Sequence, residues 1–208
     1  MNNEKRVNGL ILAAGMSSRM GSFKPLMPLR GKTLIENSID SMLLSGVSRV
    51  VVVLGYRGEE VERILRSRYL GNTIVLTYNR DYASTDMLMS VKAGISAMPG
   101  CDAFFLLPGD MPVIGKETYL ALFRAMLDKP PSITFPTLEG YRKHPPLIDS
   151  AFMNDILNFT GNGGLRAFWK LHADKVATVA VDDIGCWTDL DTFQQYICCL
   201  NRYSCGSK

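Results

Sequence analysis

Three segments of the chain carry residues whose types and spacing suit the chemistry of phosphates. The first, residues 12–24, holds small residues around Gly15 and Gly21, together with the cations Arg19 and Lys24. Small residues let the backbone approach a ligand closely, and successive amides of such a turn form a nest for phosphate oxygens. Arg19 and Lys24 would neutralise a polyphosphate. The glycine spacing fits neither a Walker A loop nor a dinucleotide-binding fingerprint, so a plain strand-to-helix turn with two solvated bases remains an alternative.

The second segment is a turn, residues 108–112, that places Asp110 directly after an apolar run. A carboxylate at that position, opposite a cationic phosphate loop, suits a hard divalent cation. Magnesium usually takes one or two protein carboxylates and completes its shell with phosphate oxygens. Pro-Gly-Asp is also a good turn sequence in its own right, so a purely structural role is equally compatible.

The third segment, residues 187–192, contains two aspartates, Asp189 and Asp191. Asp189 could supply a second metal carboxylate. Asp191 is better placed to act as the N-cap of a closing helix, where its side chain would accept a backbone hydrogen bond. We therefore expect Asp189 to face the metal and Asp191 to begin the helix.

An alternation of strands and helices must position these segments. Residues 50–54 (Val-Val-Val-Val-Leu) are apolar without alternation, which is typical of a strand covered on both faces of a parallel sheet. Thr33 and Glu36 form a capping-box pattern at the start of a helix. We expect strands at 7–12, 50–54, 73–77, 103–107, 132–135 and 176–181, helices at 33–45, 59–69, 86–98, 116–127, 150–159, 165–171 and 192–200, and a hairpin or ordered loop at 137–146.

This order predicts one α/β domain over residues 1–208, with a Rossmann-like, doubly wound and mostly parallel sheet. In the helix at 86–98 we expect Met87 to share the buried stripe with Leu88 and Val91. Ligands of such sheets bind at the carboxyl ends of the strands. The unusual residues follow Leu12, Thr77 and Leu107, where strands end, so we expect them to meet at one edge of the sheet.

At these residues the sequence resembles the MobA-like nucleotidyltransferases, and within that group the molybdenum cofactor cytidylyltransferases. The resemblance spans residues 7–196 and implies the nucleotide-diphospho-sugar transferase type of fold. It is carried by the Leu-Ala-Ala-Gly loop with its Arg19 and Lys24, the Gly-Asp-Met-Pro turn at 109–112, the His144-Pro145 pair and the Asp-x-Asp-Thr end at 189–192.

The resemblance implies a role for each matching residue. The implied roles are nucleotide binding for Leu12, Ala13, Ala14, Gly15, Ser17, Asn79 and Ser90, catalysis for Arg19, Lys24 and Asp110, Mg²⁺ ligation for Asp110 and Asp189, and an acceptor-side position for His144.

Three features bear on what the site would accept. Asp86 stands where the family usually has glycine, and Asn162 stands where it usually has aspartate. Ala13 and Ala14 match relatives that use pyrimidine nucleotides, which favours CTP over GTP. A single methyl group in a pocket is worth only about 1–3 kcal/mol, so this preference is modest.

The resemblance implies a Mg²⁺-dependent transfer of CMP from CTP to a phosphorylated acceptor, molybdopterin above others, with release of pyrophosphate. A molybdoenzyme would then be a partner. Two alternatives stay open: transfer to a sugar, choline or polyol phosphate, and an accessory protein that binds CTP without turning it over.

Composition narrows the surroundings of the protein. Lys and Arg number 23 against 20 Asp and Glu, and this net charge of +3 does not call for a nucleic-acid partner. No stretch approaches the ~18 apolar residues of a membrane span. The five cysteines form no CxxC pair, which fits reduced thiols. With no signal peptide recognised, we expect a cytoplasmic location.

Overall fold

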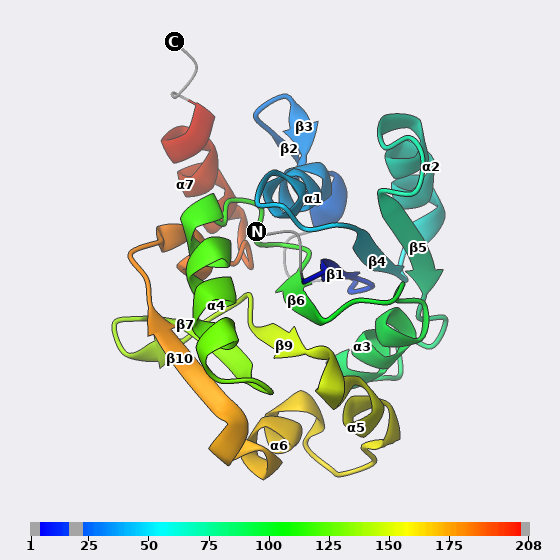
Figure 1. Cartoon of the computed structure of the whole chain (residues 1–208). Coiled ribbons are helices and arrows are strands. Elements are labelled where there is room, and N and C mark those ends of the chain that lie inside the picture. The colour runs from blue at the N-terminus through cyan, green and yellow to red at the C-terminus, as the bar shows by residue number, and fades with distance from the viewer. Residues whose placement is uncertain (1–4, 17–22, 205–208) are drawn as a thin grey trace.

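The computed structural model of the chain, shown in Figure 1, is a twisted sheet with helices packed on both faces. It describes residues 5–16 and 23–204. The main sheet comprises β1 (Val7–Ala13), β4 (Val50–Leu54), β5 (Ile74–Tyr78), β6 (Ala103–Pro108), β7 (Ile133–Leu138), β8 (Tyr141–Arg142), β9 (Leu147–Asp149) and β10 (Val176–Ala180). Its order is β10-β7-β9-β6-β1-β4-β5, with β8 paired to β7. A small separate hairpin joins β2 (Pro28–Leu29) to β3 (Lys32–Thr33).

The central strands are buried on both faces, as their unbroken apolar sequence predicted. In β4, Val50 and Val52 enter one hydrophobic core, whereas Val51 and Val53 enter the other. Parallel pairing joins β1 to both β4 and β6, and β4 to β5. A strand with water on one face would alternate apolar and polar residues, and β4 has no polar residue to place there.

The helices divide between the two faces of this sheet. One core contains residues of α1 (Leu34–Leu44), α2 (Gly58–Arg68) and α4 (Lys116–Asp128), and the other contains residues of α3 (Met87–Ser96), α5 (Met153–Asn158) and α6 (Gly164–Leu171). Figure 1 shows the same two layers. The final helix, α7 (Phe193–Ser204), packs against β2. Short 3₁₀ turns occur at η1 (Lys24–Leu26), η2 (Ser150–Phe152), η3 (Ala173–Lys175) and η4 (Ile184–Trp187). The predicted doubly wound class is confirmed.

Local details confirm some sequence predictions and correct others. Thr33 and Glu36 form the predicted capping box at the start of α1. Met87, which we expected on the buried stripe of α3, is 48% exposed, so that prediction is wrong. Asp86 caps α3, and the buried stripe begins one residue after Met87, at Leu88.

Three short strands, β2, β3 and β9, were absent from the sequence-based prediction, and of these only β9 belongs to the main sheet. The hairpin expected at 137–146 is confirmed by the antiparallel pairing of β8 with β7. Directly after it, β9 lies antiparallel between β6 and β7. A three-residue strand is too short to show a period-two pattern, which is why the sequence did not predict β9.

The order of strands reverses between β1 and β6. From β1 the chain moves outward to β4 and β5 by way of α1 and α2 on one face. It then returns along α3 on the opposite face and enters β6, on the other side of β1. Loops at such a reversal diverge and leave a crevice at the carboxyl ends of the two strands, which is where doubly wound proteins bind ligands.

Every helix within residues 5–16 and 23–204 is too short or too polar to cross a membrane.

Candidate functional site

A cavity of about 420 Å³ opens at the carboxyl ends of β1 and β6. Its walls come from segments far apart in the sequence, in agreement with the expectation that strand ends converge. The described lining residues are 12–16, Lys24, Pro25, Tyr82, 85–87, Ser90, 108–110 and Asp191.

Backbone hydrogen bonds hold these segments in register. The Gly109 amide donates to the Leu12 carbonyl at 2.9 Å, which fixes the turn after β6 against the end of β1. The Leu190 amide donates to the Asp110 carbonyl at 3.2 Å. The chain near residue 190 is therefore attached to the same turn, and this attachment brings Asp191 to the cavity.

Two glycines permit this close approach. A Cβ on Gly109 would lie 2.9 Å from the Leu12 carbonyl oxygen, and a Cβ on Gly55 would lie 2.6 Å from that of Ala14. Neither distance leaves room for a side chain against a backbone oxygen. The turns after β4 and β6 can therefore flank the end of β1 only where they carry glycine.

Lys24, Asp110 and Asp191 form what we call the charged end of the cavity. Lys24 lies at its centre and contacts both acids. The Lys24 Nζ lies 3.1 Å from Asp110 Oδ2 and 2.9 Å from Asp191 Oδ1. The lysine side chain is only 9% exposed, while the two carboxylates keep part of their surface open. Two acids thus share one ammonium group, and each remains accessible from the cavity.

Asp191, which we expected to cap the closing helix, lies at the cavity instead. The N-cap of α7 is Thr192, whose amide donates to Gln195 Oε1 at 2.7 Å while the Gln195 amide donates to Thr192 Oγ1 at 3.2 Å. The expectation that Asp191 caps this helix is therefore wrong, because Thr192 and Gln195 form their own capping box. Of the described residues, Asp191 lines the cavity, whereas Asp189 is exposed and does not.

The loop residues named from the sequence fall into two groups. Leu12, Ala13, Ala14 and Gly15 line the cavity, and so does Ser90 from α3. Ser17 and Arg19, which we expected on the phosphates, lie outside the described residues.

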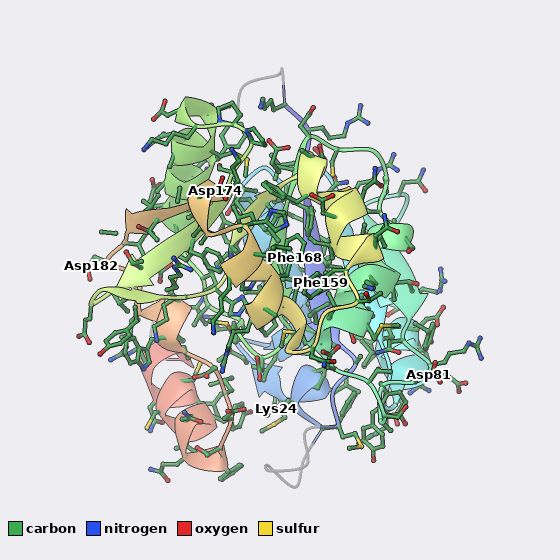
Figure 2. The ribbon with its side chains drawn as sticks, turned by 90° about the horizontal axis from the view of Figure 1, so that it is seen from below. Lys24, Asp81, Phe159, Phe168, Asp174 and Asp182 are labelled. Carbon is green, nitrogen blue, oxygen red and sulfur yellow. The ribbon has the colours of Figure 1, made fainter. Side chains whose placement is uncertain are left out.

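The side chain of Asn79, for which the resemblance implies a nucleotide contact, is bonded to its neighbours. Its side chain is buried, and Nδ2 donates to Thr85 Oγ1 and to Ser90 Oγ, both at 3.0 Å. Asn79 Oδ1 accepts from the Asp81 amide at 3.1 Å. Asp81, whose amide Asn79 holds, and Lys24 are both labelled in the lower half of Figure 2. Asn79 therefore shapes the loop that carries Thr85 to the cavity, and among described residues it is not part of the lining.

His144 follows β8 and lies near enough to Asp110 and Asp189 for their charges to act on it. Its Nδ1 is 3.4 Å from the Leu106 carbonyl oxygen. Burial lowers the pKa of the imidazole below its ordinary value, although the Leu106 carbonyl and the charges of Asp110 and Asp189 act in the opposite direction. A neutral ring at pH 7 follows, so His144 contributes no charge near the two acids.

Asp183 is a residue of the site's framework that the sequence did not single out. Its Oδ2 accepts from the Gly115 amide at 2.8 Å and from Thr118 Oγ1 at 2.6 Å, and its Oδ1 accepts from the Gly185 amide at 2.9 Å. These bonds attach the start of α4 to the chain that leads to Asp191. The sequence could have indicated this role. Asp183 is followed two residues later by Gly185, a spacing typical of a turn that the aspartate side chain closes.

The charged end fits a hard divalent cation. Over the described residues there is no group of three or more His, Cys, Asp or Glu side chains able to hold a metal ion by themselves. Asp110 and Asp191, however, supply two carboxylates that already converge on one positive charge. Such a pair suits Mg²⁺, which commonly completes its coordination with phosphate and water oxygens.

A doubly wound sheet with a charged crevice at its switch point defines the class of nucleotide-binding α/β proteins. Residues 9–177 match the model of the MobA-like NTP transferase domain, and the chain belongs to this family.

Two curated relatives match the chain over nearly its whole length. It is 29% identical over 199 residues to the molybdenum cofactor cytidylyltransferase of Escherichia coli K12, covering 95% of this chain and 97% of that protein. It is also 29% identical over 199 residues to the nicotine blue oxidoreductase of Paenarthrobacter nicotinovorans, covering 91% and 94%.

Among solved structures, a nucleotidyl transferase from Methanothermobacter thermautotroptrophicus superposes with a TM-score of 0.77 at 22% identity, covering 98% of this chain and 99% of the other. This likeness confirms the predicted nucleotide-diphospho-sugar transferase type of fold.

Proposed function

We propose that this protein transfers CMP from CTP to a phosphorylated small molecule, with molybdopterin as the acceptor, and releases pyrophosphate. The observation that carries the proposal is the position of Lys24 between Asp110 and Asp191, in a cavity at the switch point of the sheet. Membership in the MobA-like family supports nucleotidyl transfer. The name of the Escherichia coli relative supports CTP and the molybdenum cofactor.

The two ends of the cavity suit the two ends of a nucleoside triphosphate. Lys24 and the backbone after β1 offer positive charge and amide groups to the phosphates. At the other end, Ser90 Oγ accepts from Asn79 and keeps its own proton to donate to the sugar or base, and Thr85 lines the cavity beside it. Ala13 and Ala14 lie on the wall between these ends, and their methyl groups favour a pyrimidine over the larger purine.

In the proposed reaction an acceptor phosphate oxygen attacks the α-phosphorus of CTP. A new P–O bond forms, the bond from the α-phosphorus to the bridging oxygen breaks, and pyrophosphate leaves with the electron pair. The attacking phosphate is already ionised at pH 7, so no side chain must remove a proton. Because two anions must meet, charge neutralisation is the main contribution that the protein can make.

The chain's own cations would divide this work. Lys24 would exchange a carboxylate partner for an oxygen of the α-phosphate or of the attacking phosphate. Arg19 would stabilise the leaving pyrophosphate. His144, neutral and near Asp110, would border the acceptor side without adding charge.

We propose Asp110 and Asp191 as the Mg²⁺ ligands, because both line the cavity. The family resemblance implies Asp189 as the second ligand instead, and the Asp191→Asn and Asp189→Asn variants distinguish the two assignments. A cation bound there would supply positive charge to the transferring phosphate and orient it for in-line attack.

Three alternatives make different predictions. A sugar, choline or polyol phosphate acceptor would keep the same nucleotide chemistry. An accessory protein would bind CTP and release no pyrophosphate. The name of the second relative, an oxidoreductase, shows that a redox role must also be tested. The Lys24 cluster suits nucleotidyl transfer, because two acids and one ammonium can bind a metal ion and a phosphate.

The deciding experiment measures pyrophosphate release with Mg²⁺ for CTP, UTP, GTP and ATP against a panel of phosphorylated acceptors. We expect turnover with CTP and molybdopterin, followed by delivery of the product to a molybdoenzyme. Turnover with another acceptor alone would replace molybdopterin and keep the transfer. Tight CTP binding without pyrophosphate from any acceptor would contradict the enzyme assignment.

A further inference from the structure

The cavity contains an acid that the transfer mechanism does not use. Of the described acids that line it, Asp110 and Asp191 pair with Lys24, and Asp86 does not. Asp86 lies with Thr85 and Ser90, at the end that the proposed function assigns to the nucleoside. A carboxylate close to the triphosphate would repel it, whereas one near the base can accept a hydrogen bond.

The position of the Asp86 carboxylate is fixed by two helices. Asp86 is the N-cap of α3, and its Oδ1 accepts from the Met89 amide at 3.3 Å. Its Oδ2 faces the start of α6, where a Cβ on Gly164 would lie only 2.7 Å away. Gly164 has a φ of +57°, a conformation that further excludes a side chain. The backbone of α6 thus leaves room for a carboxylate at this position.

Within the described part of the chain, the Asp86 side chain forms no ion pair, and the hydrogen bond that it accepts from the Met89 amide engages Oδ1 and not Oδ2. The cation among the described lining residues, Lys24, is engaged with the acids at the other end. The Asp86 Oδ2 therefore retains its capacity to accept a hydrogen bond from a ligand.

We propose that Asp86 selects the base, by accepting a hydrogen bond from the exocyclic amino group of cytosine. An ionised carboxylate only accepts hydrogen bonds, and the cytosine amino group is a donor. Uracil carries a carbonyl oxygen at the same place, so two acceptors would face each other. Guanine also carries hydrogen-bond donors, so Asp86 alone would not exclude it. Asp86 therefore discriminates cytosine from uracil, and Ala14, just after β1, excludes the larger purines. The inference rests on the proposed use of a nucleoside triphosphate.

The test compares CTP with UTP in the wild-type protein and in two variants that keep the helix cap. Asn and Ser cap helices about as well as Asp, so Asp86→Asn and Asp86→Ser should leave α3 intact. Asp149→Asn is the matched control, because Asp149 also caps a helical turn, by accepting from the Ala151 amide at 2.9 Å. Equilibrium binding of each nucleotide with Mg²⁺ and kcat/KM for each are both measured.

We expect the wild-type protein and Asp149→Asn to prefer CTP over UTP by about tenfold or more, as for a hydrogen bond to a charged group. Asp86→Ser should reduce the ratio to near unity. Asp86→Asn should reduce it further, because an amide can donate to the uracil carbonyl.

An unchanged CTP to UTP ratio in both Asp86 variants would overturn the inference, and so would a wild-type protein that binds both equally. A change confined to the KM of the acceptor would assign Asp86 to the acceptor instead, and would also overturn it. If CTP preference in binding is lost in the variants while no acceptor gives pyrophosphate, the base contact stands and the proposed transfer fails.

Discussion

The two ends of the cavity are built in different ways. At the charged end, Lys24, Asp110 and Asp191 come from distant parts of the chain, and the two acids share one ammonium group. At the other end, the residues belong to one continuous segment that Asn79 organises through three hydrogen bonds. The charged end depends on how the sheet brings strand ends together, whereas the nucleoside end depends on local loop structure. Changes at the first should affect the rate of chemistry, and changes at the second should affect which nucleotide binds.

The largest effect should come from the acids of the charged end. Asp110→Asn should reduce pyrophosphate release by about 10²–10³-fold, since removing one group that stabilises transition-state charge has effects of that size. Asp191→Asn should weaken Mn²⁺ binding in the presence of CTP more than Asp189→Asn does, because Asp191 lines the cavity. The exposed Asp182, labelled in Figure 2, gives the control Asp182→Asn. Stronger loss in Asp189→Asn would restore Asp189 as the second ligand.

A smaller effect should follow from crowding the turn that carries Asp110. Gly109→Ala places a Cβ 2.9 Å from the Leu12 carbonyl oxygen, so the turn must shift. Overpacking of this kind costs about 1–3 kcal/mol, and we expect kcat to fall about tenfold. Gly100→Ala is the matched control, because a Cβ there meets nothing within 4 Å. Equal activity of the two variants would show that the approach of β6 to β1 does not position Asp110.

At the nucleoside end, Asn79→Ala should act on binding more than on chemistry. The substitution removes the bonds from Asn79 to Thr85 and Ser90 and leaves the Asp81 amide without its side-chain acceptor, while Thr85 keeps its bond to the Asp81 carbonyl. Losses of this kind cost about 1–3 kcal/mol. We expect the KM for CTP to rise several-fold with kcat nearly unchanged. Asn158→Ala, which removes only an exposed bond to the Asn154 carbonyl, is the control. A fall in kcat with constant KM would contradict the separation of the two ends.

The smallest expected effect is on the pH dependence of unfolding, and it comes from His144, which is not among the residues of either end. Burial lowers the pKa of His144 below 6.5 in the folded protein, so the unfolded chain binds more protons as the pH falls. The corresponding stability is present above about pH 6.5 and is lost as the pH falls toward the folded value. Denaturant unfolding at a series of pH values should therefore show a decrease below 6.5 that is reduced in His144→Gln. An identical pH profile for the variant would rule out this contribution.

Much of the charged end could be predicted from the sequence. The apolar runs of β1, β4 and β6 indicated a parallel sheet, and the carboxyl ends of such strands meet at one edge. The contact between Lys24 and Asp110 follows from that geometry. Asp191 was misassigned because aspartate before a helix usually caps it. The sequence Thr192-Phe-Gln-Gln195 carried the stronger capping-box signal, and Asp191 pairs with Lys24 instead of capping the helix.

The nucleoside end was harder to predict. The sequence marked Asn79 and Asp86 as unusual, but hydrogen bonds between close neighbours determine their orientations, and these have no periodic signature. The short strand β9 was missed for a related reason, because its three residues are defined by their partners β6 and β7. Such features depend on tertiary contacts, and local sequence carries little information about them.

The most direct test of the account is the turnover of Lys24→Ala measured beside its thermal stability, with Lys32→Ala as the control. Lys32 also pairs with an aspartate, Asp40, but its side chain is 53% exposed at the surface. We expect Lys24→Ala to reduce pyrophosphate release at least about a hundredfold while the protein stays folded, and Lys32→Ala to change neither property. Turnover of Lys24→Ala within a few-fold of the wild-type value would contradict the placement of the transferring phosphate beside Lys24, Asp110 and Asp191.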